Sequence, residues 1–227
     1  MKIYAEIYPS SNINKLKEYI KYLEAFDGFD IPDNPLGYPT MPPELIGYII
    51  RNYYNDKEII MNQRLIDINE LKLISIIKAA KSINSSIIFT QGDDPLYGNK
   101  INDLTSENAL KISLSRDVRS GLIISFNKNK TEIEKRLRLN ADMFLCVNFN
   151  NISLLNSIET KRLMPYIIIG TDKNKNILER IKQPYIRIKE LDNYIESLKC
   201  YNLYGILLSV PGDKKSLREI SNYGFSQ

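Results

Sequence analysis

The sequence contains no histidine, and this absence removes several common kinds of active site. A Ser-His-Asp triad, a Cys-His pair and a zinc site with histidine ligands all need an imidazole. Acid–base chemistry must therefore fall to carboxylates, lysines or tyrosines. The two cysteines, Cys146 and Cys200, follow no metal-ligand spacing and give no disulfide framework. We expect no metal site and a reducing, cytoplasmic location.

Long apolar runs and glycine-rich phosphate loops are also missing. No apolar run approaches the ~20 residues of a membrane helix, and the opening MKIYAEIYPS has no signal-peptide core. The absence of GxGxxG and GxxxxGK[ST] disfavours a Rossmann or P-loop enzyme. The net charge of +4 comes from scattered lysines and arginines, with no basic stripe interleaved with aromatics. We expect neither a membrane nor a nucleic-acid partner.

What the chain does contain is an alternation of apolar runs with amphipathic stretches of helical period. Runs such as SSIIFT, SGLIISF and PYIIIG are typical of parallel strands covered on both sides. The expected strands are Lys2–Tyr8, Gly28–Pro32, Glu58–Gln63, Ser86–Gln91, Gly121–Phe126, Met143–Asn148, Tyr166–Thr171 and Gly205–Val210. The expected helices are Ile13–Phe26, Pro43–Tyr54, Asn69–Asn84, Ser106–Val118, Thr131–Asn140 and Leu191–Lys199, with shorter turns at Ile152–Ile158 and Asn174–Ile181.

Eight such units in 227 residues predict one domain, an eight-stranded parallel (β/α)8 barrel of the TIM type. A doubly wound open sheet is the runner-up. Two polar loops, Asp30–Pro43 with five prolines and Gln91–Ser106, follow the carboxyl ends of strands. Barrel active sites are built from such loops.

Strand one points Ile3, Ala5 and Ile7 to one side and Glu6 to the other. In a barrel the apolar set would face the helices, and Glu6 would point into the lumen between Tyr4 and Tyr8. A carboxyl group in such a partly dry site should have a raised pKa, which suits a general acid. The alternative is an edge-strand glutamate that faces water.

Other polar residues follow strand ends, and each has two interpretations. Gly92 would let a ligand approach the backbone, and Asp93 is suited to a cation, a ribose or the amino-pyrimidine edge of a pterin. The alternative there is an ordinary acidic turn. The remaining candidates either bind a ligand or form Asx turns and helix caps: Asp30, Asp33, Asn62, Arg64 and Asn148. The basic stretch Lys128–Arg138 is either a solvated helix face or a binding site for the phosphate group of a ligand.

Several segments, taken in order, resemble the methylenetetrahydrofolate reductase family. AEIYPS resembles that family's E-[FI]-[FY]-P opening, and DGFDIPDNPLGYPTM resembles the loop after its second strand. IDINELKLISIIKAAKSINSSIIFTQGDDP resembles its D-x-N…GDxP region, EKRLRLNADMFLCVNF its K-x-K-x-x-AGAD-x-x-x-TQ-x-F segment, and YGILLSVPGD its last barrel strand. The match runs thinly over nearly the whole chain, so residues 1–227 would form a single reductase-like barrel.

The resemblance implies an oxidoreductase of one-carbon metabolism and methionine biosynthesis. Such an enzyme binds FAD and passes hydride from NAD(P)H to 5,10-methylenetetrahydrofolate, which becomes 5-methyltetrahydrofolate. By this resemblance Glu6 protonates the imidazolidine ring so that it opens to an iminium, and Asp93 contacts the pterin and modulates the flavin. The substrate-binding residues would be Asp30, Gln91 and Asn148. The cofactor-binding residues would be Asn62, Gly92, Asp94, Lys135 and Arg136, with the last two near the flavin phosphates.

The chain departs from the family at several positions. Asn62 replaces a histidine, Gln91 replaces an arginine, and Leu104 falls near the flavin-contacting tyrosine. Val147 replaces the pterin-binding glutamine. The flavin contacts are thus changed more than the two carboxylates. Both a flavoprotein and a flavin-free reductase stay open, as do folate and a modified pterin.

Two other functions also stay open. A barrel without redox chemistry would bind a methyl-pterin for a partner methyltransferase in methionine synthesis. An aldolase or isomerase would need a Schiff-base lysine, and no expected strand carries a lysine near its carboxyl end. Both a homo-oligomer and a complex with such a methyltransferase are consistent with the sequence.

Overall fold

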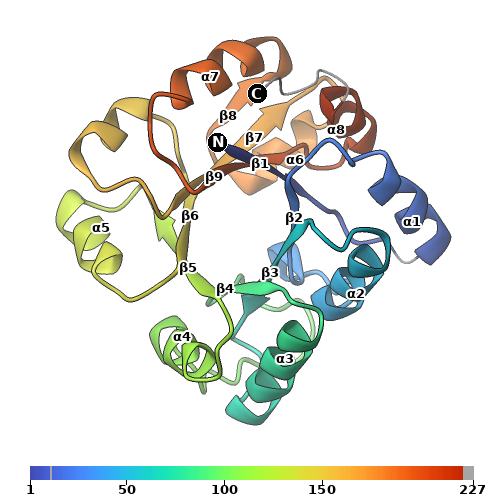
Figure 1. The fold of residues 1–227 in the computed structure, drawn as a ribbon, viewed down its shortest axis with the longest axis vertical. Coiled ribbons are helices and arrows are strands. Elements are labelled where there is room, and N and C mark those ends of the chain that lie inside the picture. The colour runs from blue at the N-terminus through green and yellow to red at the C-terminus, as the bar shows by residue number, and fades with distance from the viewer. Residues whose placement is uncertain (11, 222–227) are drawn as a thin grey trace.

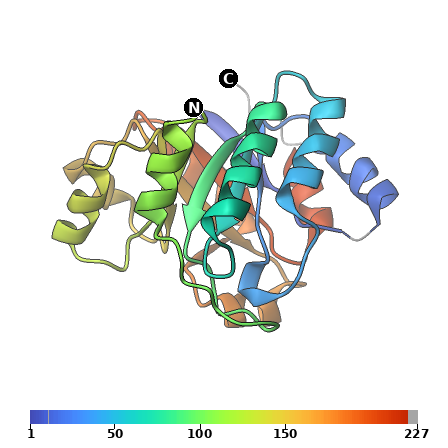
Figure 2. The same ribbon diagram turned by 90° about the horizontal axis from the view of Figure 1, so that it is seen from below.

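The computed structural model describes residues 1–10 and 12–221, and its strands form a closed barrel inside a ring of helices (Figures 1 and 2). The strands are β1 (Lys2–Glu6), β2 (Gly28–Ile31), β3 (Glu58–Arg64), β4 (Ser86–Thr90), β5 (Ser120–Ser125), β6 (Met143–Val147), β7 (Leu163–Gly170), β8 (Tyr185–Arg187) and β9 (Gly205–Ser209). The α-helices are α1 (Ile13–Lys21), α2 (Pro43–Tyr53), α3 (Glu70–Ser82), α4 (Ser106–Leu114), α5 (Lys130–Leu137), α6 (Lys175–Ile181), α7 (Leu191–Leu198) and α8 (Lys214–Ser221). Short 3₁₀ helices are η1 (Pro35–Gly37), η2 (Ile152–Ser157) and η3 (Ile188–Glu190).

The barrel is closed by eight parallel strands. Each of β1 to β6 pairs in parallel with the next strand, and β9 pairs with both β7 and β1. The predicted (β/α)8 barrel is therefore confirmed, and the open-sheet alternative is wrong. All eight expected strands are present, with small shifts at their ends.

Apart from the short 3₁₀ helices η1 and η3, one strand and one helix were not expected from the sequence. Strand β8 is three residues long and pairs only with the end of β7, outside the closed ring. Its side chains are half-buried or exposed, so it lacks the apolar run that marks the other strands. Helix α8 has only two apolar residues, Leu217 and Ile220, in an otherwise polar segment, so its apolar content is low for a helix that packs against the core.

The two faces of each barrel strand have different surroundings. Ile3, Ala5 and Ile7 join the large core between the sheet and the helices. Tyr4 belongs to a second, smaller cluster that fills the lumen together with apolar residues of the other strands: Ile60, Ile88, Met143, Leu145, Met164 and Leu207. Glu6 shares the inward side with Tyr4, because successive side chains alternate across a strand. The predicted inward direction of Glu6 follows from this packing.

The amino-terminal end of the lumen is closed by a half-buried carboxylate, Glu58. Its oxygens accept hydrogen bonds from Tyr4 Oη at 2.7 Å, from Lys2 Nζ at 3.0 Å and from Tyr204 Oη. Arg119 adds an ion pair at 3.3 Å. The sequence suggested that Tyr4 flanks Glu6, but its hydroxyl points to Glu58 at the opposite end. The lumen is thus a filled core with polar groups at each end, as in other barrels of this size.

The two long loops at the carboxyl ends of β2 and β4 interlock, and both lie at the lower edge of Figure 2. The amide of Leu36 donates to Asp93 Oδ2 at 3.0 Å, and the amide of Leu96 donates to the carbonyl of Gly37 at 3.2 Å. Gly37 has φ +76°, and a Cβ there would lie 2.2 Å from the carbonyl oxygen of Asp94. Only glycine fits this crossing of the loops.

Candidate active site

A buried carboxyl group, that of Glu6, lies at the carboxyl-terminal end of the lumen. Only 6% of this residue is exposed. Three hydroxyl groups surround its Oε2: Ser209 Oγ at 2.5 Å, Tyr166 Oη at 3.0 Å and Tyr8 Oη. Ser209 and Tyr8 also contact each other at 2.6 Å. The group is held in one place by residues of three segments that are distant in sequence.

The surroundings of Glu6 favour its protonated form. Burial raises the pKa of Glu6 above the ordinary value, and the hydrogen bonds from Ser209, Tyr8 and Tyr166 offset only part of this effect. No basic side chain is among its hydrogen-bond or ion-pair partners in the described residues. A protonated carboxyl group at the mouth of a barrel can donate a proton to a bound substrate.

A second carboxyl group, that of Asp30, lies beside the first. Asp30 follows the same inward direction on β2, directly opposite Glu6 in the strand register. It is fully buried, and its Oδ2 accepts a hydrogen bond from Asn62 Nδ2 at 2.7 Å. Burial raises the pKa of Asp30 well above its usual range, the nearby Glu6 raises it further, and Asn62 lowers it in part. Adjacent carboxyl groups of this kind disfavour double ionisation.

Asn148 lies at the same end of the barrel, immediately after β6. Its Nδ2 donates to Ser125 Oγ at 3.0 Å, and its backbone amide donates to Gln183 Oε1 at 3.1 Å. The residue has φ +56°, in the left-handed region that asparagine tolerates. It is half-buried, so part of its side chain stays accessible at the mouth. The structure therefore brings Glu6, Asp30, Asn62 and Asn148 to one end of the lumen.

The predicted site residues on the loop after β4 lie in solvent and not in the lumen. Gln91, Gly92, Asp93 and Asp94 are all exposed. Asp93 accepts a hydrogen bond from the neighbouring loop, and Asp94 pairs with Lys100 at 2.6 Å. A Cβ on Gly92 would meet the Arg64 side chain at 2.8 Å. Within residues 1–10 and 12–221, no hydrogen bond or ion pair links Asp93 with Glu6.

The two basic candidates lie on α5. Lys135 is exposed, whereas Arg136 is engaged by the protein itself. Its guanidinium contacts Glu107 at 2.5 Å, Ser106 Oγ at 3.0 Å and the carbonyl of Ile123 at 2.7 Å. These contacts connect α5 to α4 and β5. They occupy guanidinium N–H groups of Arg136 that would otherwise donate to a phosphate.

Arg64 connects the loops that frame the site. It is 2% exposed, and its guanidinium pairs with Asp67 at 3.1 Å. It also donates to the carbonyl of Asn34 at 3.1 Å and to that of Asp93 at 2.9 Å. Asp33 accepts from the backbone amide of Arg64 at 3.2 Å, and burial raises the pKa of Asp33 to about 7. Both loops therefore depend on this one side chain.

We expect Arg64→Met to lower the free energy of unfolding by about 1–3 kcal/mol, because it removes the hydrogen bonds to the carbonyls of Asn34 and Asp93 and the ion pair with the half-buried Asp67. Urea unfolding measures this loss. Arg51→Met is the control, since Arg51 binds backbone carbonyls such as those of Ile83 and Asn55 at the other end of the barrel. Both variants should lose stability, but only Arg64→Met should weaken ligand binding at the mouth. Equal ligand affinity in the two variants would contradict the role given to Arg64.

Two residues of the site were missed from the sequence, Tyr166 and Ser209. Both lie on strands in the second half of the chain. The residues around Tyr166 do not distinguish it from the other 14 tyrosines of the sequence. Ser209 carried a weak signal, because it is the single hydroxyl residue in the apolar strand GILLS. Their contact with Glu6 exists only because β1, β7 and β9 are neighbours in the closed barrel.

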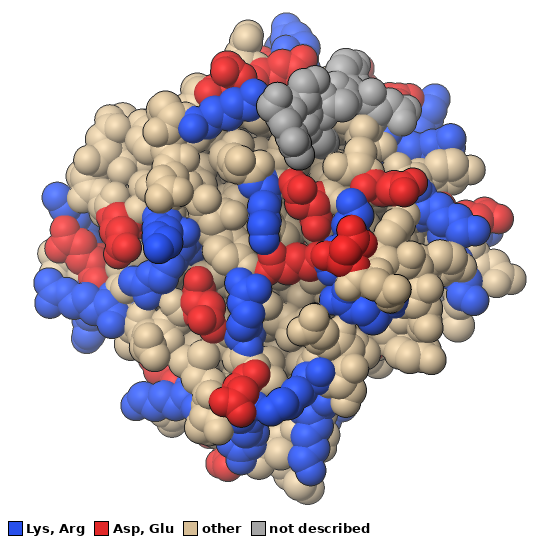
Figure 3. Space-filling view, in the orientation of Figure 1, with Lys and Arg blue, Asp and Glu red and all other residues tan. Residues whose placement is uncertain are grey.

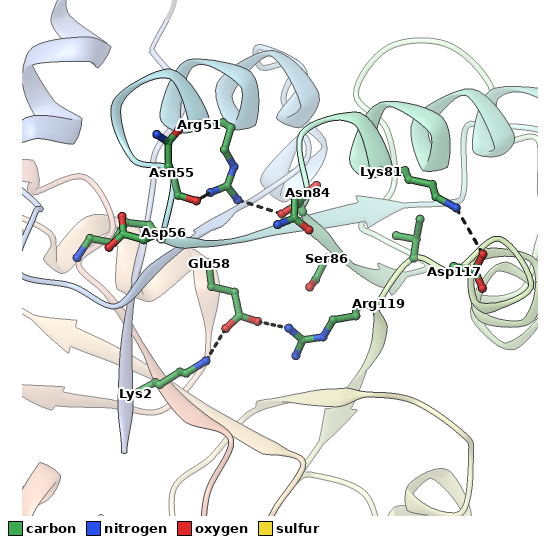
Figure 4. A pocket seen from close by; sticks show the side chains of 13 residues that line it. Lys2, Arg51, Asn55, Asp56, Glu58, Lys81, Asn84, Ser86, Asp117 and Arg119 are labelled. Carbon is green, nitrogen blue, oxygen red and sulfur yellow. Dashed lines mark hydrogen bonds and ion pairs between the residues drawn. The ribbon is translucent and has the colours of Figure 1, made fainter.

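A cavity of about 330 Å³ lies at the opposite, amino-terminal end of the barrel (Figure 4). Its charged groups are largely neutralised within the protein: Glu58 pairs with Lys2 and Arg119, and Lys81 pairs with Asp117. Acidic and basic side chains are interspersed over this face of the molecule, as Figure 3 shows. This end of a barrel commonly serves stability, so we place the candidate site at the carboxyl end.

Comparison with solved structures shows the fold and little more. An uncharacterized protein from Clostridium thermocellum, described as binding two copies of 5-methyl-5,6,7,8-tetrahydrofolic acid, matches with a TM-score of 0.65 and 14% identity over 97% of this chain and 95% of that chain. N-acetylneuraminate lyase from Fusobacterium nucleatum matches with a TM-score of 0.58 and 11% identity, over 98% and 75%. An aldo-keto reductase from Bacillus halodurans matches with a TM-score of 0.55 and 11% identity, over 96% and 83%.

No protein-family model and no curated protein matches the sequence. At these low identities the solved structures share the β/α barrel with this chain, and barrels of this kind carry many unrelated activities. None of the helices in the described part of the chain is long and apolar enough to cross a membrane. The side chains at the carboxyl-terminal end of the barrel, and not the fold, therefore indicate the function.

Proposed function

We propose that this protein is a methylene-tetrahydropterin reductase that binds its substrate at the carboxyl-terminal mouth of the barrel. The observation that carries the proposal is the buried Glu6, which is held by three hydroxyl groups and has no cationic partner among residues 1–10 and 12–221. Reduction of 5,10-methylenetetrahydrofolate, or of a related pterin, needs such an acid. The family resemblance of AEIYPS and the folate ligand of the clostridial neighbour support the same substrate class.

In this mechanism Glu6 gives its proton to the ring nitrogen that leaves when the imidazolidine ring opens. The resulting iminium carbon then accepts a hydride from NAD(P)H, so that one hydride and one proton convert the methylene group into a methyl group. Tyr8, Tyr166 and Ser209 keep the carboxyl group in place and hydrogen-bond the carboxylate left after transfer. The low exposure of Glu6 keeps bulk water away from the proton.

A resident flavin fits the residues of this chain poorly. Arg136 is already bound by Glu107 and Ser106, and Asp94 is paired with Lys100. Gly92 lies against the side chain of Arg64. Of the positions that the resemblance assigns to the flavin, only Lys135 and Asn62 keep polar groups that the rest of the described chain does not engage. We therefore favour direct hydride transfer from the nicotinamide to the pterin, without FAD.

The test is to add FAD to the purified protein, record its absorption spectrum, and then follow NAD(P)H oxidation with methylene-tetrahydrofolate. We expect no stoichiometric flavin, and we expect NAD(P)H to be consumed as the methyl product forms. Tight flavin at one equivalent would refute the flavin-free version and keep the reductase. A protein that oxidises neither NADH nor NADPH, with or without FAD, would refute the reductase itself.

A second function is a barrel that binds a methyl-pterin without redox chemistry and presents it to a methyltransferase. The clostridial neighbour is described as holding the methylated folate, and this favours the alternative enough to test it. Such a protein would bind 5-methyltetrahydrofolate and leave NAD(P)H untouched. The assay above separates the two functions, because only the reductase consumes the nicotinamide.

A further inference from the structure

Asp30 and Asn62 form a pair whose remaining acceptors have no hydrogen-bond partner in the described part of the chain. Asn62 Nδ2 donates to Asp30 Oδ2 at 2.7 Å. Asp30 Oδ1 and Asn62 Oδ1 are both buried, and neither finds a hydrogen bond anywhere in residues 1–10 and 12–221. Most buried polar atoms in folded proteins are paired, so two unpaired oxygens on one bonded pair need an explanation.

The hydrogen bond between Asp30 and Asn62 determines whether the two unpaired atoms can donate or accept. The amide nitrogen of Asn62 is used on Asp30, so the free atom of this side chain is its oxygen, an acceptor. The free atom of Asp30 is a carboxyl oxygen, which is an acceptor in the ionised form that a bound N–H donor stabilises. The pair therefore offers acceptors from two neighbouring strands, β2 and β3, and a ligand that satisfies them must bring N–H or O–H donors.

The pair also lies where a ligand would sit. Asp30 and Asn62 share the inward side of their strands, because Phe29, Ile31 and Met61 pack outward against the helices. Asp30 is directly opposite Glu6 in the register. A metal ion is a poor candidate for these oxygens, since the described residues contain no group of three or more His, Cys, Asp or Glu side chains able to hold one.

We propose that Asp30 and Asn62 bind the edge of a ring that carries adjacent N–H donors, such as the amino and ring N–H groups of a 2-amino-4-oxopyrimidine. The inference deepens the proposed function and rests on it, because a reduced pterin carries this edge. It assigns ring recognition to Asp30 and Asn62 at the lumen, whereas the family resemblance assigned the pterin contact to Asp93. Asp93 then remains a loop residue that binds the amide of Leu36.

The test uses three probes: 2-amino-4-hydroxypyrimidine, the same ring without its amino group, and 5-methyltetrahydrofolate. Binding is measured by ligand-observed NMR and calorimetry with the full chain. We expect Asp30→Asn to weaken binding of both amino-bearing probes by at least about 30-fold, as expected for losing a hydrogen bond to a carboxylate. Asn62→Leu should weaken both by about 10-fold for the loss of a neutral acceptor, and it serves as a second, independent variant.

Asp27→Asn is the matched control, because Asp27 precedes the same strand at its other end and accepts a bond from the backbone amide of Ile3. It should leave all three affinities unchanged. Loss of binding in Asp93→Asn with full binding in Asp30→Asn would overturn the inference and leave the reductase standing. So would wild-type protein that binds the ring equally well without its amino group, or binds neither ring. Ring binding that depends on Asp30, in a protein that reduces no methylene-pterin, would uphold the inference and refute the proposed function.

Discussion

Replacing Glu6 by glutamine is expected to abolish reduction of the methylene-pterin, with a loss of about 10²–10⁴-fold in kcat. Glutamine keeps the shape of the side chain and can still bond to the hydroxyls of Tyr8, Tyr166 and Ser209, but it has no proton to give. We expect the variant to fold and to bind 5-methyltetrahydrofolate with little change. Steady-state NAD(P)H oxidation and a binding isotherm measure the two effects separately.

Glu58→Gln is the matched control, since Glu58 is the half-buried glutamate at the other end of the same lumen. Burial alone would raise the pKa of Glu58, but hydrogen bonds from Tyr204, Tyr4 and Lys2 and the charge of Arg119 outweigh it, and the pKa is lowered. This carboxylate is ionised and structural, so its loss should reduce stability and leave kcat unchanged. Wild-type turnover in Glu6→Gln would show that another group supplies the proton.

Asp30→Asn is expected to stabilise the folded protein, in contrast to most changes at a buried position. The new amide nitrogen can donate to Asn62 Oδ1, and this pairs an acceptor that now has no partner. Leaving such a group unpaired costs about 1–3 kcal/mol. We expect a gain of that size at pH 8 in urea unfolding, accompanied by the loss of ring binding described above.

The gain should depend on pH in a defined direction. Burial and the nearby Glu6 raise the pKa of Asp30 well above its ordinary value, so the folded protein keeps a proton that the unfolded chain releases above about pH 4. Wild-type stability therefore falls as pH rises from about 4 through the folded pKa. Asp30→Asn removes this contribution, so its advantage should be larger at pH 8 than at pH 5. The contributions of Glu6 and Asp33 have the same sign and remain, so the slope is reduced rather than removed. An advantage that shrinks with rising pH would contradict the raised pKa.

Local pattern was enough to predict the barrel and the direction of Glu6. The alternation of Ile3, Ala5 and Ile7 with Tyr4 and Glu6 sets which side faces the helices, and strand geometry then fixes the rest. The placement of Asp30, Asn62 and Asn148 at one end of the barrel could also be predicted, because the carboxyl ends of parallel strands meet there. These features depend on residues close in sequence.

The partners of those residues could not be predicted in the same way. The contacts of Glu6 with Tyr166 and Ser209 span 160 and 203 positions of the chain, and they depend on how the barrel closes. Arg64 was a candidate ligand or cap, and its role in joining two loops depends on how Asn34 and Asp93 approach it. The bond between Asp30 and Asn62 follows from the register of β2 and β3, which a single sequence does not reveal.

The apolar layer in the middle of the lumen separates two glutamates whose pKa values are shifted in opposite directions, upward for Glu6 and downward for Glu58. Tyr4, Ile60 and Leu207 belong to this layer between Glu58 and Glu6. Little water can enter such a layer, and each glutamate is governed by its own neighbours. In practice the two ends can be redesigned independently. A new ligand preference could be built at the mouth by changing Asp30 and Asn62, while the ionised Glu58 cluster keeps anchoring the base.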